Sequence, residues 1–123
     1  MPWKRTAKPQ GWYPRRGEVC LFKLDKERPA LVISTDALNK FSRDVCVLPI
    51  LTSEHRQFSL RPKLDAGEGG LSFDSWVKCD QPTTLLKDLA AFPALGALSA
   101  EALWRVELAL LDALELRSRA PGP

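Results

Sequence analysis

Long hydrophobic runs are absent from this sequence. No stretch approaches the ~18 apolar residues that a membrane-spanning helix needs. The amino-terminal end also lacks the apolar segment of a secretory signal peptide. We therefore expect a soluble protein of the cytoplasm that does not enter a membrane.

Cysteine is scarce and widely spaced. The three cysteines, Cys20, Cys46 and Cys79, each lie in a separate apolar run, and an odd, scattered set does not indicate a disulfide framework or a zinc site. We expect small buried hydrophobic side chains in a reducing compartment. The aspartates at positions 74, 80 and 88 lack the spacing of metal ligands, so the sequence predicts neither a metal nor another cofactor.

Acidic side chains are missing from the first 17 residues. This stretch holds five cations and leaves 13 basic and 15 acidic residues for the remainder, so the net charge of +3 originates in the amino-terminal arm. Trp3, Trp12 and Tyr13 alternate there with cations and prolines. The composition suits stacking on single-stranded bases, and it equally suits a flexible tail. We treat residues 1–15 as a basic, aromatic and flexible extension and residues 118–123 as a flexible tail.

The rest of the chain has the length and apolar content of one compact domain. Alternating apolar positions and β-branched residues predict several short strands, which together favour a small barrel. Four are strong (19–24, 30–34, 45–51 and 76–79), and two are weaker (58–60 and 95–98).

A helix is predicted near the carboxyl end. Ser99 is a suitable N-cap, Glu101 complements the helix dipole, and the helical pattern continues to about Leu116. Its apolar residues form two neighbouring stripes, 103/106/110/114 and 104/108/111. Two stripes are compatible with a deeply seated helix and with a subunit interface.

Arg28 is the most informative candidate for chemistry. Pro29 directly follows it and opens an apolar, β-branched strand, which predicts that Arg28 projects from a loop at the strand mouth. A guanidinium group binds phosphate through two parallel hydrogen bonds and stays charged at physiological pH. Arg28 is therefore a candidate phosphate ligand, although a surface arginine at a strand end would look the same.

Four short blocks occur in a defined order: Arg16–Phe22, Arg28–Ser34, Pro49–Ser53 and Trp76–Gln81. With the closing helix, this order resembles the MazF/PemK family, from about Arg16 to about Leu116. The resemblance implies a mainly β (β+α) fold, a small SH3-like β-barrel of the MazF/CcdB kind with a C-terminal α-helix, over residues 16–117.

The resemblance also implies a function. MazF/PemK proteins are the toxins of toxin–antitoxin pairs and are endoribonucleases. They cut single-stranded RNA without a metal by 2′-hydroxyl attack, leaving a 2′,3′-cyclic phosphate and a 5′-hydroxyl. The resemblance implies a homodimer and a MazE-like antitoxin whose flexible acidic and apolar segment occupies the RNA groove.

The catalytic pair that the resemblance implies is Arg28 and Thr52. This chain reads Pro-Ile-Leu-Thr-Ser, one residue longer than the usual Pro-Ile-Thr-Ser block, and one extra residue turns a strand's side chains to the other face unless a bulge absorbs it. Ser53 is a neighbouring RNA-binding candidate. His55, the only histidine, could relay a proton or could be an ordinary solvated residue.

The segment Asp80–Leu85 is aligned with a family block that commonly reads Asp-Gln-Ile-Arg-Thr. Gln81 and Thr84 match it and are RNA-binding candidates, whereas Pro82 and Thr83 replace an apolar and a basic residue. Lys78 or Lys87 could compensate for the lost cation, or either could be an ordinary solvated surface lysine. The connector Asp25–Glu27 is shorter than the glycine-rich loop of many relatives.

Two rival functions remain open at the level of sequence. CcdB-like gyrase poisons share the expected barrel, but their helix ends in a tryptophan that enters gyrase, whereas Trp104 lies early in this predicted helix. The altered block after Asp80 leaves room for an RNA-binding barrel that has lost catalysis, because a fold alone does not certify activity.

Overall fold

A computed structural model of the chain describes residues 7–53, 59–117 and 121. Eleven elements follow one another within these ranges: β1 (Glu18–Lys23), β2 (Glu27–Val32), α1 (Asp36–Phe41), β3 (Asp44–Leu51), β4 (Lys63–Leu64), the 3₁₀ turn η1 (Glu68–Gly70), β5 (Ser75–Val77), β6 (Thr83–Leu86), the 3₁₀ turn η2 (Lys87–Leu89), β7 (Gly96–Ala97) and α2 (Ala100–Ala113).

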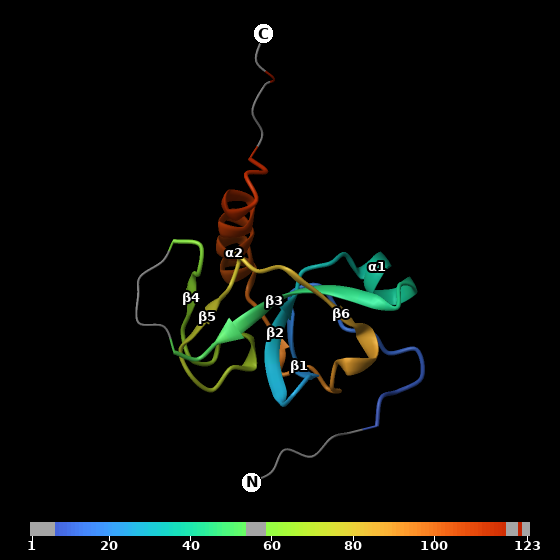
Figure 1. The fold of residues 1–123 in the computed structure, drawn as a ribbon. Helices are drawn as coiled ribbons and strands as arrows, with labels where there is room; N and C mark the ends of the chain where they lie inside the picture. The colour runs from blue at the N-terminus through green and yellow to red at the C-terminus, as the bar shows by residue number, and fades with distance from the viewer. Residues whose placement is uncertain (1–6, 54–58, 118–120, 122–123) are drawn as a thin grey trace.

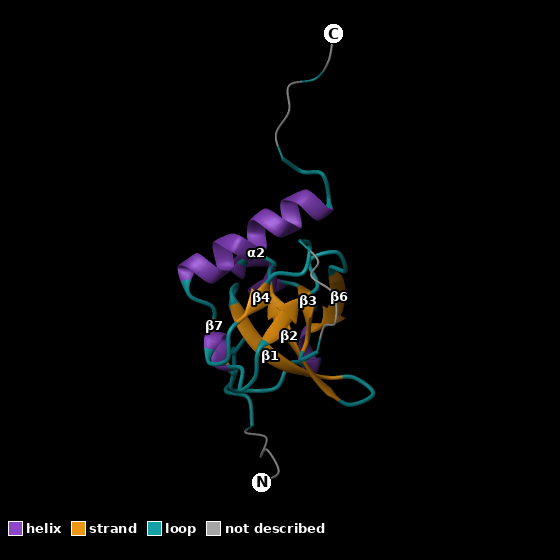
Figure 2. Cartoon of the chain, turned by 90° about the vertical axis from the view of Figure 1, so that its left-hand side faces the viewer, coloured by secondary structure: helices purple, strands orange, loops and turns teal. Residues whose placement is uncertain are grey.

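The strands form one antiparallel, strongly curved sheet (Figure 1). Its order is β4-β5-β3-β2-β1-β7, and β6 also pairs with β3. β3 therefore pairs with three strands: β2 along one edge, and β6 and then β5 along the other edge. Helix α2 lies across the sheet (Figure 2). This arrangement confirms the predicted mainly β fold with a C-terminal helix.

Side-chain alternation along β1, β2 and β3 divides the core into two clusters. Val19, Leu31 and Leu48 face α2, and they pack with the helix residues Ala102, Val106 and Ala109. The alternate residues of these strands face the opposite way and form a second cluster, which also contacts β6 and the amino-terminal arm. Its buried strand residues are Cys20, Phe22, Ala30, Val32, Val45 and Val47. Both faces of the central strands are therefore buried.

The strands that the sequence predicts most strongly are all present as β1, β2, β3 and β5, with ends shifted by up to three residues. The weaker strand at 95–98 is confirmed as β7. The other weak prediction is wrong for its described part, because Ser59 and Leu60 lie in a turn; Phe58 lies outside the described residues. The sequence did not predict α1, β4 or β6.

The described part of the amino-terminal arm contacts the domain. Trp12 packs edge-on against Phe92, with ring centroids 5.4 Å apart, and Pro14 is fully buried. The ammonium group of Lys8 donates to the carbonyl of Asp88 at 2.7 Å. Residues 7–15 therefore form part of the packed structure on the side of the second core cluster.

The cysteines are free, as expected, and two of them are fully buried. Burial raises the pKa of the Cys20 and Cys79 thiols to about 12. Both groups are therefore neutral at physiological pH and behave as small apolar side chains.

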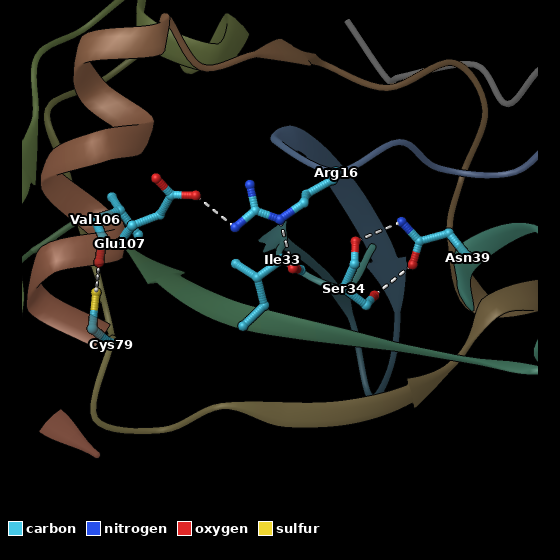
Figure 3. A network of polar contacts seen from close by, with 7 residues as sticks. All are labelled: Arg16, Ile33, Ser34, Asn39, Cys79, Val106 and Glu107. Atoms are coloured by element: carbon cyan, nitrogen blue, oxygen red, sulfur yellow. Dashed lines mark hydrogen bonds and ion pairs between the residues drawn. The ribbon is translucent and has the colours of Figure 1, made fainter. Parts of the chain in front are cut away.

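A polar network joins the start of β1 to helix α2 (Figure 3). Arg16 donates from Nε to the carbonyl of Ile33 at 3.0 Å and from Nη2 to the carboxylate of Glu107 at 2.6 Å. In the neighbouring helix α1, the fully buried Asn39 donates to the carbonyl of Ser34 at 2.9 Å. The two bonds from Arg16 fix the segment before β1 against the body of the domain.

Helix α2 begins where the sequence predicts. The hydroxyl of Ser99 accepts from the backbone N–H of Ala102, and Glu101 lies in the first turn. The buried residues of the helix are Ala102, Val106 and Ala109, and Leu103 and Leu110 are partly buried beside them. The predicted stripe 103/106/110/114 is therefore only partly correct, because Leu114 is 44% exposed, and Trp104 remains 59% exposed. None of the helices formed by the described residues has the length and apolar content needed to cross a bilayer.

Candidate functional site

A groove of about 220 Å³ opens on the sheet near the turn between β1 and β2. Most of its lining side chains are apolar, and its polar lining consists of two cations and one hydroxyl. The lining residues are Phe22, Leu24, Arg28, Pro29, Ala30, Val47, Pro49, Ile50, Leu51, Lys78, Thr83 and Leu85.

Strand alternation places Arg28 on the groove side of β2. It lies opposite Phe22 in the β1–β2 ladder, and it shares a face with Ala30 and Val32 of the second core cluster. The strand leaves the core at this point, so the Arg28 side chain is 48% exposed. The prediction that Arg28 projects from a loop before the strand is therefore wrong, because β2 already begins at Glu27 and Arg28 is paired with β1. Its side chain nevertheless lines the groove, as a phosphate ligand would need to.

The guanidinium group of Arg28 is paired with Asp25 in the preceding turn. Nε donates to Oδ1 at 3.0 Å, and Nη2 donates to Oδ2 at 3.1 Å. These hydrogen bonds from Arg28 lower the pKa of the Asp25 carboxyl to about 2, and the carboxylate raises the pKa of Arg28 further. Both groups are therefore fully charged at neutral pH.

Lys78 supplies the second cation of the groove. It follows β5, and its backbone N–H donates to the carbonyl of Pro49 at 2.9 Å. Thr83, at the start of β6, directs its hydroxyl proton to the carbonyl of Gln81 at 2.9 Å. The groove thus combines a mostly apolar lining with two positive charges, which suits an anionic ligand that carries planar apolar groups.

Thr52 and Ser53 lie just beyond the groove. Pro49 and Leu51 line it, and the two core clusters show that side chains alternate regularly along β3, with Val45 and Val47 on one face and Leu48 and Ile50 on the other. The extra residue of this block is therefore not absorbed by a bulge, and Leu51 takes the last lining position. Thr52 follows in a bend and is exposed, as is Ser53, and neither lines the groove. His55 lies outside the described residues.

The remaining candidates lie on or near β6. Gln81 is exposed, and Thr84 is exposed on the face of β6 turned away from the groove. Thr83, which the sequence marked only as the replacement of a basic residue, occupies the lining position instead. Its spacing of two from Leu85, a residue packed on the core, was the signal that could have identified it.

Asp80 anchors the segment that carries these residues. Arg61 donates to both of its carboxylate oxygens at 3.1 Å, and the two side chains are only 19% and 24% exposed. The bonds from Arg61 lower the pKa of Asp80. Among residues 7–53, 59–117 and 121, no group of three or more histidine, cysteine or acidic side chains could hold a metal ion.

Residues 15–114 match the family described as the PemK-like, MazF-like toxin of type II toxin–antitoxin systems. The chain belongs to this family. No curated protein matches it significantly in sequence.

Solved structures of the family share the fold. The chain is 27% identical to an endoribonuclease in complex with its cognate antitoxin from a mycobacterial species, with a TM-score of 0.74 over 86% of this chain and 99% of that one. It is 27% identical to the Mycobacterium tuberculosis toxin MazF-mt6, with a TM-score of 0.72 over 82% and 99%. A MazE–MazF structure from Deinococcus radiodurans, at 24% identity, has a TM-score of 0.72 over 84% and 96% and shows likeness of fold.

Proposed function

We propose that this chain is a toxin-type endoribonuclease that cuts single-stranded RNA in the groove around Arg28. The observation that carries the proposal is that Arg28 and Lys78 both line a mostly apolar groove, in a fold shared with proteins described as endoribonucleases. A toxin of this kind acts in the cytoplasm, where its substrate is found.

The reaction needs no group beyond the chain, the RNA and solvent. The ribose 2′-hydroxyl loses its proton to solvent as its oxygen attacks the adjacent phosphorus, the bond from phosphorus to the 5′-oxygen breaks, and the 5′-oxygen takes up a proton from solvent. The products are a 2′,3′-cyclic phosphate and a 5′-hydroxyl. Negative charge grows on the phosphoryl oxygens during attack, and the fork of Arg28 stabilises that charge.

The other groove residues support binding. Lys78 attracts the neighbouring phosphate as a point charge, and the apolar lining, including Phe22 and Leu51, receives the planar face of a base. Ser53 and Gln81 are exposed close in sequence to groove-lining residues, and Thr84 is exposed on the outer face of β6; each is proposed to contact the RNA strand outside the groove itself. Their roles and that of His55 are part of the proposal.

Thr52 is proposed to orient the attacking hydroxyl. Its hydroxyl has no hydrogen-bond partner among the described residues and follows the groove-lining Leu51, whereas the hydroxyl proton of Thr83 is already donated to Gln81. We expect Thr52→Val to lower kcat by about 10²-fold and Thr83→Val to lower it by less than about threefold. Single-turnover cleavage of a labelled RNA measures both. Equal effects would remove Thr52 from the mechanism.

The partners follow from the same surfaces. Complexes of relatives with their cognate antitoxins support an antitoxin partner, and a flexible acidic and apolar segment fits this groove.

The second apolar stripe of α2, which consists of Trp104, Leu108 and Leu111, supports a homodimer. With Arg16 it lines a concavity of about 330 Å³ that includes Trp104, Glu107, Leu108, Leu110, Leu111 and Leu116. A single-chain mass in solution would contradict the dimer.

One assay tests the proposal against both rivals. The purified protein is incubated with a long single-stranded RNA in EDTA, and the ends are mapped. Discrete cuts with 2′,3′-cyclic phosphate ends support the nuclease. Intact RNA together with gyrase-dependent breaks in DNA would instead identify a gyrase poison, and tight binding without cuts would identify a non-catalytic RNA-binding barrel.

A further inference from the structure

We propose that Asp25 competes with the RNA phosphate for Arg28 and thereby sets how tightly the groove binds RNA. The inference rests on the proposed function, because it assigns the phosphate site to Arg28. It adds a residue that regulates affinity without taking part in the reaction.

The geometry of the pair is that of a phosphate complex. Asp25 presents two oxygens to Nε and Nη2 of Arg28, at 3.0 and 3.1 Å, and a phosphate group would use the same two donors. One fork cannot hold both groups. A phosphate that binds Arg28 through Nε and Nη2 must therefore displace the carboxylate.

The short turn between β1 and β2 positions the carboxylate. Only Leu24, Asp25 and Lys26 separate the two strands, and the turn is closed by the backbone N–H of Leu24, which donates to the carbonyl of Lys26 at 3.1 Å. Asp25 thus lies three residues before Arg28 at the groove mouth. A displaced Asp25 stays tethered beside the bound phosphate, where the two negative charges repel each other.

The pair can be displaced because it is exposed. The side chains of Arg28 and Asp25 are 48% and 71% exposed, and exposed ion pairs are weak and screened by salt. RNA can therefore displace Asp25 at a moderate loss of affinity. We expect Asp25→Asn to tighten RNA binding by about three- to tenfold, since it removes the competing charge and the repulsion together.

The experiment measures the binding of a fluorescein-labelled single-stranded RNA with 2′-O-methyl groups, which cannot be cut, by fluorescence anisotropy at 0.15 M salt. Asp44→Asn is the matched control, because Asp44 is an exposed aspartate at the opposite end of β3 from the groove-lining Leu51. Seven residues of strand separate the two ends by roughly 23 Å, well beyond the screening length of about 8 Å. Asp25→Asn and Asp25→Ala should both tighten binding, and Asp44→Asn should not.

A cycle with Arg28 separates the two levels of the proposal. In the Arg28→Ala background, Asp25→Asn should give no gain, because the group for which Asp25 competes is absent. If Arg28→Ala binds RNA as tightly as the wild type, the proposed function fails at Arg28. If Arg28→Ala weakens binding but Asp25→Asn gains no more than Asp44→Asn, or binds more weakly than the wild type, the competition alone is overturned.

An NMR titration tests the pair without RNA. The Asp25 carboxyl should titrate near a pKa of about 2 in the wild type and return toward the ordinary range for aspartate in Arg28→Ala. An unchanged titration in the variant would show that Arg28 does not hold Asp25, and the competition would again be overturned.

Discussion

Arg28→Ala is expected to lower kcat/KM for RNA cleavage by at least about 10²-fold, the cost of removing one preset donor to a developing oxyanion. The substitution should leave the melting temperature unchanged, because the side chain is 48% exposed and its partner Asp25 returns to water. Cleavage of a labelled oligonucleotide, together with thermal unfolding followed by circular dichroism, measures both quantities.

Two controls make the result specific. Arg28→Lys keeps the charge but loses the fork, so it should retain intermediate activity. Arg117→Ala removes an arginine with a comparable bidentate partner, Asp112, just beyond α2. Arg117 does not line the groove, so that variant should cleave RNA at the wild-type rate. Wild-type cleavage by Arg28→Ala would exclude the mechanism proposed here.

The strongly apolar elements were predictable because burial dictates their sequence. In β1 and β3, both faces pack against a core cluster, which requires nearly continuous apolar residues. The helix α2 was equally predictable, because Ser99 is a suitable N-cap and apolar residues recur at helical spacing after it. β1 and β3 contribute lining residues of the groove, and β2, which lies between them and was also predicted, carries Arg28.

The missed elements depend on contacts between distant segments. β4 has only two residues, and β6 follows a proline and carries two threonines, so neither has a clear alternating pattern. α1 has six residues, too few for a stable isolated helix. Its carbonyl end is held by Lys87, whose ammonium group donates to Asn39 and Lys40 at 2.9 and 3.1 Å.

The candidate site was predictable by residue type and less so by register. Arg28 and Lys78 were identified from the sequence, and both line the groove. Thr83 and Thr84 differ by one position on a two-residue period, so the alignment with the family block could not decide which of them faces inward. The ion pair between Arg28 and Asp25 depends on the short turn between β1 and β2, and no periodic pattern in the sequence predicts it.

Close packing of η1 against the entry to β7 gives the largest expected effect on stability. Gly70 has a φ of +76°, and a Cβ there would lie 2.0 Å from the carbonyl oxygen of Leu95. That oxygen belongs to the backbone, so it cannot move aside without displacing β7. Ser99, two residues after β7, caps α2, and its N–H donates to the carboxylate of Glu68 in η1. A displacement of β7 would therefore disturb the start of α2 as well.

Gly70→Ala is therefore expected to lower the free energy of unfolding by about 3 kcal/mol or more, combining left-handed strain with overpacking. Gly67→Ala separates the two causes. Its φ is +98°, but a Cβ there meets nothing within 4 Å, so it should cost only the strain, about 1–2 kcal/mol. Urea unfolding of both variants measures the difference. Equal losses would show that the close approach of Gly70 to Leu95 contributes nothing to the loss of stability.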